Sequence, residues 1–293
     1  MRNVPYTPVV IGFVHIPKTA GSTVKFVLRN TFVLRHCDFR AAGKSLRLHP
    51  RDLALARRVH PGLRSIAGHT LIHPSATLEG VRFFTFLRDP VARVASAYAH
   101  HVRGNRGRRR GERTLTLEEF VARDRPGGWQ TFQIAGSADV EEAKRILRER
   151  FFFVGLTERF DESLAALAAL SPFPLDTRYR RKNVAPAGDP VRKAVREDPA
   201  QRAIVEAANR SDRALYDWVA GTLYPELLAK ARGAAGPAFG ALGETEVGSA
   251  RILLCRGWNK AVFRTLQKAA HALGLRDPRD ARPRPAPAGP PPP

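Results

Sequence analysis

The hydrophobic positions of this chain form short blocks that alternate with longer amphipathic stretches. Apolar runs at 8–16, 64–69, 80–90 and 151–158 are short, and they predict buried strands. Between them, apolar residues recur every three or four positions, as a helix with one buried face requires. Strands that are apolar along most of their length and alternate with helices predict a parallel sheet covered on both faces. We therefore expect an α/β fold with three layers, α/β/α, and a central parallel sheet.

Several expected helices carry sequence signals at their first residues. Pro90 suits the first position of a helix, and Thr116 followed three residues later by Glu119 forms a capping-box pattern. We expect a helix that begins near Ser22 or Thr23 and runs to 32, and helices over 50–59, 90–100, 114–124, 139–150, 159–170 and 198–223, the last with a break near 209–212.

The character of the chain changes after about residue 228. The next stretch is rich in Gly and Ala, and the last residues are rich in Pro and predict disorder. We expect one domain over 1–230 and a C-terminal extension over 231–293. Within the extension, 251–275 predicts a basic amphipathic helix, and we expect it to pack on the protein itself rather than on a partner.

The net charge of +22 favours an anionic partner such as a phosphate-bearing cofactor, an acidic glycan, a nucleic acid or a membrane surface. Arg greatly outnumbers Lys and Ala and Pro are abundant, which is also typical of codon bias, so the charge carries only part of the argument. The basic residues are dispersed, and no helix-turn-helix, RNA-recognition or zinc pattern is present. We therefore do not expect nucleic acid to be the partner.

Cys37 and Cys255 are the only two cysteines, and we expect both to be free thiols. No run approaches the roughly 18 apolar residues that span a membrane, and the N-terminal residues lack a signal-peptide pattern. These features predict a cytoplasmic protein without a transmembrane segment.

The segment PKTAGST at 17–23 joins the first expected strand to the first expected helix. The first-turn N–H groups of a helix have no intrahelical partner, and the helix dipole adds partial positive charge there. Ala20 and Gly21 let an anion approach the backbone, Thr19, Ser22 and Thr23 add hydroxyl groups, and Lys18 adds a full charge. The turn therefore predicts a phosphate site. It lacks the GxxxxGK[ST] pattern of a P-loop NTPase, because Lys18 precedes the glycine.

FVHIPKTAGST at 13–23 resembles the 5′-phosphosulfate loop of sulfotransferases that use 3′-phosphoadenosine-5′-phosphosulfate (PAPS). The group most similar contains heparan sulfate 2-O-sulfotransferase and bacterial relatives. FFTFLRDPVARVASAYAHH at 83–101 resembles the 3′-phosphate motif of that family. The likeness covers roughly 10–225, and it implies the P-loop NTPase-like sulfotransferase fold.

The resemblance implies PAPS as co-substrate and no metal. It assigns 18–23 to the 5′-phosphosulfate, with Lys18 stabilising the leaving group, and it assigns Arg88 and Ser96 to the 3′-phosphate. An arginine fork and a hydroxyl suit a phosphate monoester. The alternative for Arg88 and Asp89 is an ion pair that fixes a helix start. Lys182 and Asn183, in a segment that resembles the family's basic loop, are candidates to close over the phosphates, or they belong to a solvated loop.

A base must take the proton of the acceptor hydroxyl, and a histidine near its ordinary pKa suits that task. His69 closes the second expected strand at the sheet edge that holds the turn, so it is our first candidate. His73 follows in a segment that departs from the family, and the choice between the two stays open. His15 is expected to shape the loop by hydrogen bonding, and it is the reserve candidate.

The expected activity is transfer of a sulfuryl group from PAPS to a hydroxyl, with a carbohydrate as the expected acceptor. The glycine-broken basic segment 101–113 is either a surface loop or an attractor for an acidic acceptor. The alternatives are a P-loop-like nucleotide or small-molecule kinase, disfavoured by the position of Lys18, and a basic nucleic-acid-binding protein.

Overall fold

The structure is a computed structural model of the 293-residue chain. It describes residues 9–40, 50–69, 71, 78, 80–105, 114–123, 127–179, 188–240, 248 and 250–272. Of the sequence-based expectations, those on the segments 106–113 and 180–187, on His73 and on the Pro-rich end of the chain lie outside these residues.

A single sheet of five strands forms the centre of the protein. Its strands are β1 (Val10–Val14), β2 (His36–Asp38), β3 (Ser65–Gly68), β4 (Val81–Leu87) and β5 (Phe151–Leu156). They lie in the order β2-β3-β1-β4-β5, and every neighbouring pair is parallel. After β1 the chain goes to one side of the sheet, and after β4 it goes to the other. The carboxyl ends of β1 and β4 therefore lie at a topological switch point, where open parallel sheets bind ligands.

The helices that follow the strands are of very different lengths. Those before β5 are α1 (Gly21–Phe32), α2 (Pro50–Val59), α3 (Pro90–Asn105), α4 (Leu117–Ala122), α5 (Trp129–Ala135) and α6 (Val140–Arg150). Those after β5 are α7 (Phe160–Leu170), α8 (Pro190–Glu197), α9 (Pro199–Ala208), α10 (Arg210–Trp218), α11 (Tyr224–Ala235), α12 (Ala250–Trp258) and α13 (Arg264–Ala272). Two π-helical segments, Val219–Leu223 and Asn259–Phe263, join α10 to α11 and α12 to α13.

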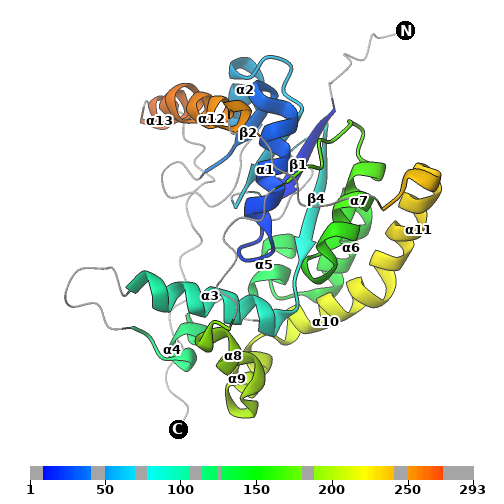
Figure 1. The fold of residues 1–293 in the computed structure, drawn as a ribbon. Helices are drawn as coiled ribbons and strands as arrows, with labels where there is room; N and C mark the ends of the chain where they lie inside the picture. The colour runs from blue at the N-terminus through cyan, green and yellow to red at the C-terminus, as the bar shows by residue number, and fades with distance from the viewer. Residues whose placement is uncertain are drawn as a thin grey trace.

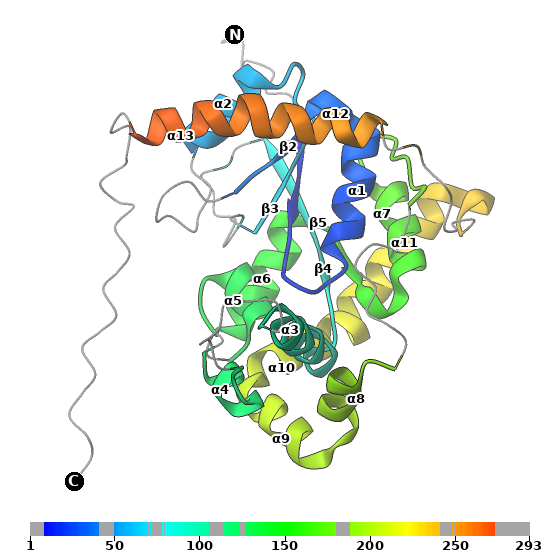
Figure 2. The same cartoon turned by 60° about the vertical axis from the view of Figure 1, so that its left-hand side comes forward.

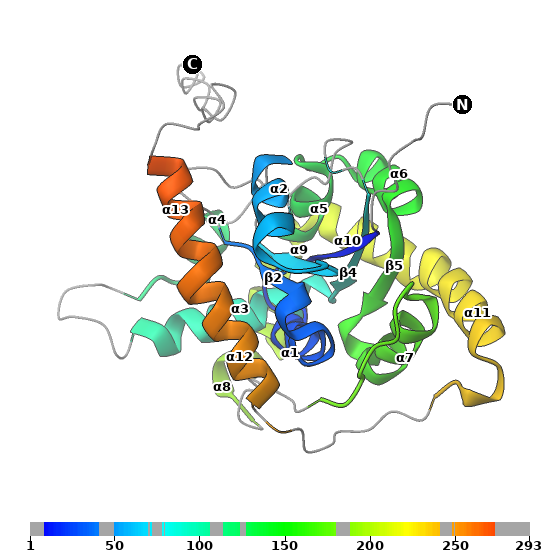
Figure 3. The same cartoon turned by 90° about the horizontal axis from the view of Figure 1, so that it is seen from above.

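Helices cover both faces of the sheet. Figure 3 shows α1 and α7 on one face and α2 and α6 on the other, so the three-layer α/β/α arrangement expected from the sequence is present. The strands read as apolar runs because both of their faces are buried; Phe13, Phe83 and Phe84 are fully inaccessible to solvent.

A second group of helices lies beyond the carboxyl ends of the strands. Figures 1 and 2 show α3, α4, α8 and α9 gathered there, below the sheet. They share a small apolar core that includes Val94, Leu117, Val195 and Val205. This core places α3 and α8 over the switch point, next to the turn between β1 and α1.

Most expected elements are confirmed. Helix α2 has the expected bounds, and α1 begins at Gly21, one or two residues before the expected start. Thr116 and Glu119 form the capping box before α4, and the break between α9 and α10 falls at Asn209. The elements that were missed include β2, which has only three residues, the short helix α8, and α11. Helix α11 runs across residue 230, where we expected a domain boundary. Both cysteines are free, as expected, and the structure shows that both are buried.

The C-terminal helix segment 250–272 packs on the protein itself, as expected. Ile252 and Phe263 belong to the same apolar core as the sheet. Asn259 contacts the edge of β2 that faces away from β3: its Oδ1 accepts the Asp38 N–H at 2.8 Å, and its Nδ2 donates to the His36 carbonyl at 3.1 Å. One side-chain amide therefore replaces the peptide group that a neighbouring strand would offer.

Across the described residues, no helix combines the length and the apolar character that crossing a membrane requires.

Replacing Asn259 with Ala removes the partner of both edge groups and leaves them buried. We expect the free energy of unfolding to fall by about 1–3 kcal/mol, because a buried donor or acceptor without a partner keeps its full desolvation cost. Urea unfolding measures this change. Thr265→Ala, at an exposed position of the same helix, is the matched control, and an equal effect of the two substitutions would contradict the edge role of Asn259.

Candidate anion-binding site

The turn between β1 and α1 presents a helix N-terminus that no side chain caps. Lys18 and Ala20 both have left-handed backbone conformations, with φ of 72° and 59°. Ala20 is the N-cap residue and makes no side-chain capping bond, and the first turn of α1 contains no acidic residue. No side chain of the turn therefore neutralises the positive end of the helix dipole, although the Thr23 N–H already donates to the Ala20 carbonyl at 2.9 Å.

Gly21 is required by the packing of His15 beneath the turn. A Cβ atom at residue 21 would lie 1.9 Å from two atoms of the His15 ring, so no larger residue fits without moving that ring. His15 is buried, and burial is the main reason why its pKa lies well below the ordinary value. A neutral His15 ring therefore forms the floor of the turn. It does so by packing and not by the expected hydrogen bonding, because its Nδ1 is buried without a hydrogen-bond partner among the described residues.

The hydroxyl residues of the turn differ in exposure. Thr19 is fully buried, and its hydroxyl donates to the Ile16 carbonyl at 2.9 Å, so this side chain holds the turn together. Thr23 is also buried, whereas Lys18 and Ser22 are partly exposed. The groups that remain accessible in the turn are therefore its backbone, Ser22 and the Lys18 ammonium.

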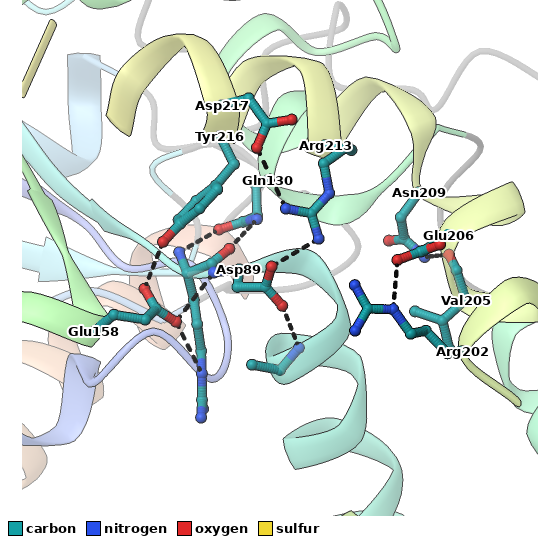
Figure 4. Close-up of polar contacts among 12 residues, drawn as sticks. Asp89, Gln130, Glu158, Arg202, Val205, Glu206, Asn209, Arg213, Tyr216 and Asp217 are labelled. Atoms are coloured by element: carbon teal, nitrogen blue, oxygen red, sulfur yellow. Dashed lines mark hydrogen bonds and ion pairs between the residues drawn. The ribbon is translucent and has the colours of Figure 1, made fainter. Parts of the chain in front are cut away.

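Arg88 follows β4 and reaches the same turn. Its Nη1 donates to the Lys18 carbonyl at 3.1 Å, which brings two segments 70 residues apart to one place. The Asp89 carboxylate does not pair with Arg88. It accepts the Ala92 N–H at 2.8 Å, as the cap of α3, and it pairs with Arg213 at 2.7 Å. Figure 4 shows Asp89 turned toward Arg213.

Helix α5 fixes the backbone of Arg88 through Gln130. The Gln130 Oε1 accepts the Arg88 N–H at 2.9 Å, and its Nε2 donates to the Arg88 carbonyl at 2.8 Å. Buried Asp212 in turn accepts the Gln130 and Thr131 N–H groups, which are first-turn donors of α5. The neutral amide of Gln130 therefore fixes the backbone of Arg88. The fully buried Asp212 carboxylate binds the N-terminus of α5 and not Arg88.

Positive charges from three elements surround Lys18. The pKa of Lys18 is lowered mainly by desolvation, and then by repulsion from Arg103, Arg192 and Arg88. The pKa of Arg88 is also lowered, by desolvation and by repulsion from Arg192. Glu158 lies 3.9 Å from the Arg88 Nε and offsets part of this charge. Arg103 pairs with Asp189, the cap of α8. The site is therefore electropositive, as anion binding requires.

Ser96 lies on α3 one turn before His100, on the same side of the helix. The charge of Lys18 is the largest cause of the lowered pKa of His100, which places this side of α3 near the turn. Ser96 itself is 9% exposed.

His69 follows β3 and stacks on His15, with ring centroids 3.9 Å apart. Its Nδ1 lies 2.6 Å from the His15 carbonyl, so Nδ1–H is the donor and Nε2 is left without a proton in the neutral ring. The residue is exposed, although His15 covers one ring face. Desolvation of the ring is the main cause of the lowered pKa of His69.

Gln133, one turn beyond Gln130, ties the ends of β1 and β3 together. Its Nε2 donates to the carbonyls of His15 and His69, at 3.3 and 3.1 Å. The supporting roles of α5 and the arginines of α8 were not predicted. The two glutamines at 130 and 133 on one helix face were a usable sequence signal, whereas nothing in the sequence placed Arg192 near Lys18.

The structure brings Arg88 to the 18–23 turn and His69 to His15, the residue beneath that turn, and it places Ser96 on α3. Lys182, Asn183 and His73 lie outside the described residues. Within the described part of the chain, no group of three or more His, Cys, Asp and Glu side chains could hold a metal ion.

Comparison with protein-family models finds no match, and comparison with curated proteins finds none either.

Gly21→Ala should lower the free energy of unfolding by about 1–3 kcal/mol, because the new methyl group overlaps the His15 ring. His15→Ala creates space beneath residue 21, so adding Gly21→Ala to that variant should cost clearly less. Urea unfolding of the wild type, both single variants and the double variant gives the coupling energy. Strictly additive effects would show that the two residues do not oppose each other.

Proposed function

We propose that this protein is a PAPS-dependent sulfotransferase that transfers a sulfuryl group to a hydroxyl group, with a carbohydrate as acceptor. One observation carries the proposal: Arg88 and the 18–23 turn, the two segments that resemble the two phosphate motifs of the family, meet through the 3.1 Å contact between Arg88 and the Lys18 carbonyl. A donor with anionic groups at both ends needs both segments in one place.

The charge distribution supports the same proposal. The uncapped N-terminus of α1 and Lys18 suit the 5′-phosphosulfate, and Arg88 and Ser96 suit the 3′-phosphate. Arg192, which comes from α8, adds charge on the side away from the sheet. Lys18 would stabilise the negative charge that develops on the bridging oxygen as the bond from sulfur to that oxygen breaks.

His69 is the base in this proposal. Its Nε2 would accept the proton of the acceptor hydroxyl while the hydroxyl oxygen bonds to sulfur and adenosine 3′,5′-bisphosphate leaves. The bond from Nδ1–H to the His15 carbonyl orients the ring and fixes the tautomer with a free Nε2. The lowered pKa of His69 keeps that nitrogen unprotonated near neutral pH.

The direct test is transfer of labelled sulfate from PAPS to a panel of glycans, lipids and small phenols. Lys18→Ala should abolish turnover and only partly weaken PAPS binding, whereas Lys230→Ala, at an exposed position of α11, should behave as wild type. Calorimetry with PAPS and with ATP and magnesium separates this proposal from a kinase. Binding of ATP with magnesium and none of PAPS, or salt-sensitive binding of unrelated duplexes alone, would overturn it.

Arg88→Ala should weaken binding of adenosine 3′,5′-bisphosphate by about 10–100-fold, the range expected for a charged hydrogen bond to phosphate. Binding of adenosine 5′-phosphosulfate, which lacks the 3′-phosphate, should change little. Calorimetry with both nucleotides gives the comparison. An equal loss for the two ligands would remove the 3′-phosphate from Arg88 and leave only a structural role for this residue.

His69→Ala should lower kcat by about 10²–10⁴ with little change in affinity for adenosine 3′,5′-bisphosphate. In the wild type, the rate should be level above neutral pH and fall as the pH drops through the His69 pKa, below 6.5, because protonation removes the base. The variant should lose this acid limb. Near-normal activity would move the base to His73 or His15.

A further inference from the structure

The large apolar side chains that are most exposed lie together on the C-terminal helix segment. Leu253, Leu254 and Leu266 are 62%, 55% and 45% exposed. Among the described residues, these are the large apolar side chains with the highest exposure, and all three lie between 250 and 272. Figures 2 and 3 show α12 and α13 as one continuous helix along the outside of the molecule.

The buried side of this helix is a single row. It consists of Ile252, Cys255, Asn259, Phe263 and Gln267, which are mostly four residues apart. A four-residue row would drift around an α-helix of 3.6 residues per turn, and the wider π-helical turn over Asn259–Phe263 offsets this drift. One side of the helix therefore stays on the protein over its whole length, and the side that carries the leucines stays in solvent.

The same helix carries only positive charge. Residues 250–272 contain no Asp or Glu. Four cations, Arg256, Lys260, Arg264 and Lys268, recur at intervals of four, so they form a row beside the buried one. None of the four forms an ion pair within the described part of the chain. Each of these cations follows a residue of the buried row by one position, whereas Leu254 and Leu266 each precede one, so they lie on the other flank of the helix, and Leu253 lies between the two flanks on the outward side. An outward apolar side with a row of cations along one border is typical of helices that lie in the surface of an anionic membrane.

We propose that the face of α12 and α13 that carries Leu253, Leu254 and Leu266 docks the protein on an anionic lipid bilayer. The leucines enter the boundary between head groups and acyl chains, and the cation row contacts lipid phosphates. Charge favours an anionic bilayer over a second copy of the chain as the partner of this face. A second copy, with the same net charge of +22, would bring its own row of cations against the first. The inference is independent of the proposed sulfotransferase activity.

Flotation with lipid vesicles tests the proposal on the full chain. We expect binding to vesicles of phosphatidylcholine mixed with phosphatidylglycerol, and at least about tenfold weaker binding to phosphatidylcholine alone. Replacing Leu253, Leu254 and Leu266 with Ser should weaken binding to the mixed vesicles at least about tenfold. These positions are exposed, so the fold should be retained, and an unchanged melting curve checks this.

Charge substitutions complete the test. Lys260→Glu with Lys268→Glu should weaken binding to the same vesicles, and the matched control, Arg210→Glu with Lys230→Glu at exposed positions away from the helix, should not. The absence of vesicle binding would overturn the proposal. Equal losses in the two charge variants, or binding that survives loss of the leucines, would also overturn it, since the overall charge alone would then explain binding. The proposal would also be overturned if the protein did not bind vesicles and instead formed a dimer in sedimentation that the serine substitutions dissociate.

Discussion

Mutual repulsion among positive side chains is the constraint around which this structure is organised. Desolvation is the main cause of the lowered pKa of Lys18, and repulsion from Arg103, Arg192 and Arg88, which come from other parts of the chain, lowers it further. These mutually repelling cations need a rigid support to stay close together. The parallel sheet, with its switch point at the ends of β1 and β4, provides that support. An anion bound among these cations would reduce their repulsion. The unfavourable free energy of bringing the cations together is already part of the folding free energy, so it does not weaken anion binding.

The structure holds the cations mainly through neutral groups. Gln130 binds the backbone of Arg88, Gln133 binds the carbonyls of His15 and His69, and both glutamines belong to α5. The buried carboxylate of Asp212 accepts the N–H groups of the first turn of α5 and makes no contact with Arg88. Amides position a cation without neutralising it, so the positive potential remains available to a ligand. A carboxylate in the place of Gln130 would compete with the anion for the same arginine.

The sequence predicted the layers, the parallel sheet and most helices, because buried parallel strands and one-sided helices leave strong periodic patterns. It missed β2, since three residues of mixed polarity carry no period, and α8, which packs on the smaller core. At the site, the meeting of Lys18 and Arg88 followed from two motifs and one topological rule. The contribution of Arg192 depends on how α8 packs against α3, which local patterns do not encode. The clash between Gly21 and His15 likewise arises from side-chain packing that spacing alone does not reveal.

The bond pattern of Asn259 has a consequence for how the protein behaves in concentrated solution. An unprotected outer strand of a sheet is a template on which strands of other molecules add, and this is a common route to insoluble assemblies. Here the amide of Asn259 occupies the outward N–H and C=O groups of β2, and the helix that carries it shields them. A segment that composition sets apart as an appendage therefore covers this edge of the sheet against strands of other molecules, and a chain shortened before residue 250 would lose that safeguard.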